Sequence, residues 1–113
     1  MKVEFEKTML ISSELLSYCH LMGADEYHLD IKVVSGVTVF AIKAFPTKMS
    51  DEDLKRLRKK LGTPRQREME QEFWGLSGES ETVSELTLVG MMSDEADVEY
   101  KDGVLSITIK RGA

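Results

Sequence analysis

The residues of this chain whose types could do chemistry are few, and their spacing brings no reactive pair together. Cys19 and His20 are neighbours, but adjacent residues on a helix point about 100° apart, so a thiolate–imidazole pair is excluded. We expect Cys19 in the core. His20 and His28 show no His-x-x-x-His or Glu-x-x-His spacing, so surface or hydrogen-bonded histidines are expected and no metal site. Without an oxyanion motif near either histidine, the chain shows no catalytic constellation.

Two other stretches have a possible binding chemistry. The loop Gly75-Leu76-Ser77-Gly78 lacks the lysine and following Ser/Thr of a phosphate-binding P-loop, so an ordinary connection is expected. The basic residues between Lys55 and Arg67 are flanked by acidic ones, which favours a solvated helix face with internal ion pairs. Trp74 remains open: it is either a partner anchor or a half-buried residue at a helix end.

Length and charge exclude several classes of protein. The 113 residues suffice for one domain, and a core of that size needs neither disulfide nor metal. No apolar run is long enough for a membrane span, and the first six residues do not resemble a signal peptide. A net charge of −5 argues against nucleic-acid binding. One cysteine fits the reducing cytoplasm, where we expect the protein.

The first half of the chain predicts a helix followed by a hairpin. Apolar residues recur at helical spacing over residues 8–22, and Gly23 is placed to end that helix. The alternation in residues 2–6 predicts a short edge strand before it. Residues 27–33 and 37–45 read as strands joined at Ser35-Gly36, the second one stopping at Pro46.

The second half predicts three helices and another hairpin. Ser50 is the expected N-cap of a helix that ends at Gly62, and Thr63-Pro64 is expected to restart a helix at once, over residues 63–76. A further helix is expected over residues 82–93. The turn signal Asp102-Gly103 then joins the last two strands. This order predicts an α+β two-layer sandwich of 113 residues, with helices on one face of a four- or five-stranded sheet.

Two stretches of the chain, residues 13–23 (SELLSYCHLMG) and residues 85–100 (ELTLVGMMSDEADVEY), together resemble a known family. The first looks like the Glu-x-x-x-Asn helix of GHKL (Bergerat-type) ATPase domains, above all those of anti-sigma-factor serine kinases and histidine kinases. The second resembles the segment after the glycine-rich lid of that family. The element order agrees from about residue 8 to 111. The resemblance implies a histidine-kinase-ATPase-like fold.

The same resemblance implies that the nucleotide-binding residues are largely lost. Glu14 matches the activating glutamate, but the asparagine that holds Mg²⁺ falls on Tyr18. The adenine-reading aspartate falls near Ala44-Phe45-Pro46, and the phosphate loop falls on Val83-Ser84-Glu85, where a carboxylate repels phosphate. The threonine expected after the last turn is replaced around Val104-Leu105. We therefore expect neither ATPase nor kinase activity and no cofactor.

These inferences lead to a non-catalytic, regulatory or protein-binding domain, of the kind found in a bacterial signalling or anti-sigma-type circuit. An edge strand makes a homodimer a further expectation. One alternative is a divergent serine kinase or ATPase that binds ATP with Mg²⁺ and uses Glu14 as base. A second is a pocket for a small hydrophobic ligand. The candidate cleft residues are Glu14, Tyr18, Phe40, Phe45 and Leu105, and the candidate partner contacts are Trp74, Leu76, Met91, Arg58 and Arg65.

Overall fold

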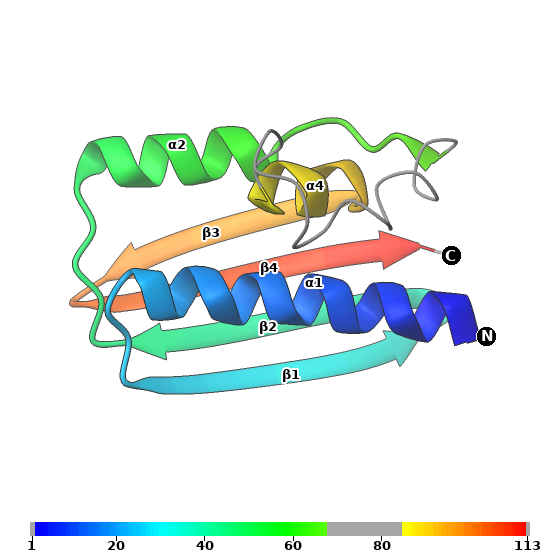
Figure 1. The fold of residues 1–113 in the computed structure, drawn as a ribbon, viewed down its shortest axis with the longest axis horizontal. Helices are drawn as coiled ribbons and strands as arrows, with labels where there is room; N and C mark the ends of the chain where they lie inside the picture. The colour runs from blue at the N-terminus through cyan, green and yellow to red at the C-terminus, as the bar shows by residue number, and fades with distance from the viewer. Residues whose placement is uncertain (1, 68–84, 113) are drawn as a thin grey trace.

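The computed structural model describes residues 2–67 and 85–112, in which helices cover one face of a β-sheet (Figure 1). The elements are α1 (Lys2–Leu21), β1 (Glu26–Val34), β2 (Val37–Phe45), α2 (Asp51–Leu61), α4 (Glu85–Met91), β3 (Glu95–Lys101) and β4 (Val104–Gly112). The described strands form one antiparallel sheet in the order β1-β2-β4-β3. The expected two-layer α+β architecture is confirmed. None of the described helices is both long and apolar enough to cross a bilayer.

Helix α1 places one apolar stripe on the sheet and ends at a glycine. Ile11, Leu15 and Cys19 follow one another at four-residue spacing and are completely buried. Gly23 adopts φ +93°, and its amide donates to the His20 carbonyl, while the next amide donates to the carbonyl of Cys19. This pair of bonds is a Schellman motif, which satisfies carbonyls that the helix itself leaves open.

The edge strand expected over residues 2–6 is wrong, because α1 already begins at Lys2. The Glu4 carbonyl accepts the Thr8 hydroxyl, and the Glu4 carboxylate lies 3.5 Å from the Lys7 ammonium. That carboxylate also accepts both Nη2 bonds of Arg111, at 3.1 and 3.2 Å. A five-residue alternation is too short to distinguish strand from helix, and the contacts of Glu4 with Lys7 and Thr8 have the spacing of a helix.

Both expected hairpins have turns of the same geometry. Ser35 and Gly36 have φ values of +50° and +78°, and Asp102 and Gly103 have +52° and +79°. Positive φ at both central residues is the type I′ turn, whose twist matches that of the flanking strands. The turns therefore pair β1 with β2 along their whole lengths, and the whole of β3 with residues 104–110 of β4.

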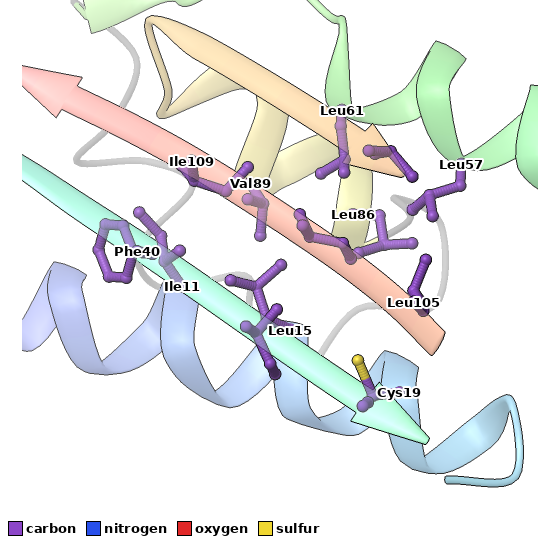
Figure 2. Close-up of a cluster of buried hydrophobic side chains, with 14 of the residues drawn as sticks. Ile11, Leu15, Cys19, Phe40, Leu57, Leu61, Leu86, Val89, Leu105 and Ile109 are labelled. Carbon is purple, nitrogen blue, oxygen red and sulfur yellow. The ribbon is translucent and has the colours of Figure 1, made fainter. Parts of the chain in front are cut away.

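The core lies between the helices and the two central strands. In the register of β2 with β4, Phe40 faces Ile109, Ile42 faces Ile107 and Ala44 faces Leu105, and all of them are buried. Side chains of α1, α2 and α4 converge on these strands from the same side (Figure 2). The opposite sheet face has no helix packed on it in the described part of the chain.

Helix α2 begins as expected but is not followed immediately by another helix. Ser50 and Asp53 form a reciprocal capping box, and Leu57 and Leu61 are buried against the core. The expected restart at Thr63 is wrong for the described residues, since 64–66 are not helical. The Thr63 hydroxyl donates back to the Lys60 carbonyl and so helps to end α2. Most of the expected helix over 63–76, with Trp74 and Leu76, lies outside the described residues.

Helix α4 crosses the end of α2 at backbone contact. A Cβ built on Gly90 would lie 2.5 Å from the Lys60 carbonyl oxygen and 3.0 Å from that of Leu61. Only glycine allows this approach. α4 falls within the helix expected over 82–93, whose start lies outside the described residues.

Candidate functional site

A cavity of about 450 Å³ opens where the C-terminal half of α1 meets α2 and α4. Glu14 and Tyr18 both line it, at one-turn spacing on α1. Lys60 of α2 and Leu86 of α4 form the opposite wall. The structure thus brings together two of the five expected cleft residues.

The other expected cleft residues lie elsewhere. Phe40 and Leu105 are completely buried in the core and are not among the residues that line this cavity. Phe45 follows the inward-facing Ala44, so it lies on the opposite sheet face, where its ring stacks on His28 at a centroid distance of 5.7 Å. Because side chains alternate along a strand, Phe45 and Tyr18 lie on opposite sides of the sheet. The hydrophobic pocket expected from Tyr18, Phe40, Phe45 and Leu105 is therefore not formed.

Tyr18 is a poor ligand for a cation. Its burial, together with the nearby Asp53 carboxylate, raises the pKa of the phenol above its ordinary value. The hydroxyl therefore stays protonated and neutral at physiological pH, whereas Mg²⁺ prefers anionic or amide oxygens. Among residues 2–67 and 85–112 no group of three His, Cys, Asp or Glu side chains is arranged to hold a metal ion.

Cys19 and the histidines take structural positions. Burial raises the pKa of the Cys19 thiol to about 11, so the nucleophilic thiolate is not populated. His20 Nδ1 lies 3.1 Å from the Tyr27 hydroxyl, which itself donates to the Ala24 carbonyl. His28 pairs with Glu26 on the outer sheet face. Both histidines thus have a local partner.

The two arginines expected to contact a partner hold the fold together. Arg58 donates to the Val98 carbonyl and fastens α2 to β3. Arg65, whose side chain is only 8% exposed, donates to the Gly112 carbonyl and to Asp94. Met91 is half-buried and packs against the core. Arg58 and Arg65 therefore both have partners within the fold.

The Asp94 carboxylate contacts both the end of β4 and the segment that follows α2. It accepts the Gly112 amide at 2.7 Å and an Arg65 N–H at 3.0 Å, and the Arg67 guanidinium lies 3.7 Å away. The backbone amide first, and then the two guanidinium groups, hold the pKa of the Asp94 carboxyl below its ordinary value despite partial burial.

A pH-dependent stability follows from the lowered pKa of Asp94. The stabilisation is fully present above the unfolded pKa, near 3.8, and is lost as pH falls through the lower folded value. Asp94→Asn is expected to reduce the free energy of unfolding at pH 7 by about 1 kcal/mol. Urea unfolding between about pH 5 and pH 2.5 should show a shallower decline for the variant. Parallel declines would contradict this role.

The exposed apolar residues gather at a different place, along α1 and β1. Phe5, Met9 and Ile31 line an open groove of about 420 Å³, and Val33 follows Ile31 on the same face of β1. Their exposed fractions are 64%, 56%, 42% and 70%. We call these four residues the apolar edge. Sequence reasoning missed the apolar edge, because it assigned alternating apolar positions of a strand to the core.

A comparison with models of known protein families and with curated proteins found no match to this chain.

Proposed function

We propose that this chain is a non-catalytic, regulatory protein-binding domain that acts through the apolar edge of α1 and β1. The observation that carries the proposal is the position of the exposed apolar side chains on the surface. Within the described residues, the large exposed apolar side chains all lie on α1 or β1: Phe5, Met9, Leu21, Ile31, Val33 and Val34. Of these, Phe5, Met9 and Ile31 line one groove, and Val33 lies on the same face of β1 as Ile31. Contiguous apolar surface of this kind is typical of protein interfaces.

The side chains at the positions where GHKL domains bind a nucleotide support the same proposal. On the resemblance to GHKL domains, Tyr18 would take the place of the metal-holding asparagine, and its phenol is neutral and half-buried. Ala44 would lie near the adenine-reading position and is buried in the core. A degenerate domain of that kind would keep a scaffold and bind a protein in place of a nucleotide.

The test is affinity capture from the native cytosol with three versions of the protein. Wild type and Lys59→Glu, which changes the exposed basic face of α2, are expected to retain the same protein, whether a different chain or a further copy. Ile31→Glu is expected to lose it, because a carboxylate would be buried in the interface. Equal retention by Ile31→Glu, or loss in Lys59→Glu alone, would overturn the proposal.

A further inference from the structure

The two outer strands of the sheet differ in how their free edges are treated. At the β3 edge, the Val98 carbonyl accepts a hydrogen bond from Arg58. A side-chain cap of this kind discourages strand addition. β1 is longer, contains no proline and pairs with β2 without a bulge. No described strand or side-chain cap covers its other side.

The geometry of the turn defines which main-chain groups of β1 face outward. In a two-residue hairpin, the residues that flank the turn exchange hydrogen bonds, so Val34 pairs in this way with Val37. Counting back by twos, the even-numbered residues of β1 bond to β2. The N–H and C=O groups of Tyr27, Leu29, Ile31 and Val33 therefore point away from the sheet. The same counting from the Lys101–Val104 pair shows that the main-chain groups of Val98 point away from β4. The Val98 carbonyl accepts the Arg58 hydrogen bond on that side.

We propose that β1 pairs antiparallel with β1 of a second copy of this chain, about a two-fold axis at Ile31, and joins two sheets into one. The inference rests on the proposed function and names the partner of the apolar edge. In this register Ile31 faces its own copy, and Leu29 faces Val33 on both sides of the axis. The outward main-chain groups of all three residues then find partners.

Charge complementarity favours this register. Asp30 and Lys32 lie on the outer sheet face and are exposed, and the axis at Ile31 places Asp30 of each copy opposite Lys32 of the other. An axis at Asp30 would instead set two Asp30 carboxylates opposite each other. An axis at Leu29 would pair Val33 with Asp25 and leave the most exposed apolar side chain of the edge against a carboxylate.

The helix layer completes the interface. α1 and β1 run in opposite directions, so the N-terminal turns of α1 lie beside the C-terminal half of β1 (Figure 1). Phe5 and Met9 line the groove together with Ile31, next to the proposed axis. Pairing at Ile31 therefore brings the exposed side chains of α1 in both copies toward the same axis, and it covers the whole apolar edge.

A charge exchange tests the proposal in solution. Sedimentation equilibrium of the full chain is expected to show a monomer–dimer equilibrium. Lys32→Asp should raise the dimer dissociation constant by about tenfold, because it sets like charges opposite each other twice. The double variant Asp30→Lys/Lys32→Asp restores both pairs and should recover the wild-type constant. Both sites are exposed, so circular dichroism should show folded protein in every case.

Disulfide trapping tests the register. Ile31→Cys is expected to form a disulfide dimer, since the facing Cα atoms would lie about 5.5 Å apart. Val33→Cys alone should not, because its copies would lie about 13 Å apart along the strand, but it should cross-link with Leu29→Cys in a mixture. The buried Cys19 thiol remains unreactive in each variant.

The outcomes separate this inference from the proposed function. A wild-type chain that stays monomeric, a dimer indifferent to Lys32→Asp, or cross-linking of Val33→Cys with itself would overturn the pairing at Ile31. If the chain is monomeric but Ile31→Glu still loses a captured protein, the protein-binding function stands and only the self-pairing fails. If neither is observed, both fail.

Discussion

Gly90→Ala is expected to reduce the free energy of unfolding by about 2–3 kcal/mol, the largest effect of any single methyl group we expect in this chain. The added Cβ would lie 2.5 Å from the Lys60 carbonyl oxygen and 3.0 Å from that of Leu61. Both atoms belong to the backbone of α2, so relief requires the two helices to move apart and to disturb their buried contacts. Alanine's better helix propensity offsets about 1 kcal/mol of the cost.

Gly23→Ala is the matched control, because it adds the same methyl group in open space. Its only cost is the positive φ of +93°, for which about 1 kcal/mol is expected. Chemical unfolding followed by circular dichroism compares the two variants. If Gly90→Ala were as stable as wild type, α4 could not cross α2 at backbone contact.

Glu4→Gln is expected to reduce the free energy of unfolding by about 2 kcal/mol at pH 7. Arg111 is 2% exposed and donates twice to the Glu4 carboxylate and once, at 2.7 Å, to the Met92 carbonyl. Removing one partner of a fully buried pair typically costs about 3–5 kcal/mol. The Glu4 side chain is 43% exposed, so water screens part of the interaction and the smaller value is expected.

A double-mutant cycle and a surface control identify the pair as the cause. Glu4→Gln/Arg111→Met should be less destabilised than the sum of the single variants, because the interaction can be lost only once. Glu52→Gln removes an exposed carboxylate that lies 4.0 Å from Arg56, and it should change stability by less than about 0.5 kcal/mol. Additive effects of Glu4→Gln and Arg111→Met would contradict a direct pair.

The pKa of Glu4 gives this pair a pH dependence. Burial would raise the pKa, but the charge and hydrogen bonds of Arg111, aided by Lys7, lower it below the ordinary value of 4.5. The contribution of the pair is therefore fully present above that pH and is lost as pH falls through the lower folded pKa. The difference in stability between wild type and Glu4→Gln should shrink accordingly in acid.

Local signals predicted most of the fold. The pairs Ser35-Gly36 and Asp102-Gly103 predicted tight turns, and Ser50 as N-cap predicted the start of α2. The expected helix start at Thr63 failed although the competing contact is local. Thr63 has the sequence of an N-cap, yet its hydroxyl bonds back to the Lys60 carbonyl.

The candidate site was less accessible to sequence reasoning than the fold. Glu14 and Tyr18 share a cavity because they lie one helical turn apart, which spacing predicts. The salt bridge of Arg111 with Glu4 joins residues that are far apart in the sequence, and no local pattern predicts it. Phe5, Met9 and Ile31 have the types and spacing of core residues. Only the position of β1 at the edge of the sheet shows that they remain exposed.

The most direct test of the proposed function, protein binding in place of nucleotide binding, is isothermal titration with ATP and ADP in the presence of Mg²⁺. On the proposed function, the neutral Tyr18 phenol at the position of the family's metal-holding asparagine predicts no saturable heat. A dissociation constant below about 100 µM, equivalent to about 5.5 kcal/mol, would contradict the account and favour a divergent ATPase or kinase that uses Glu14.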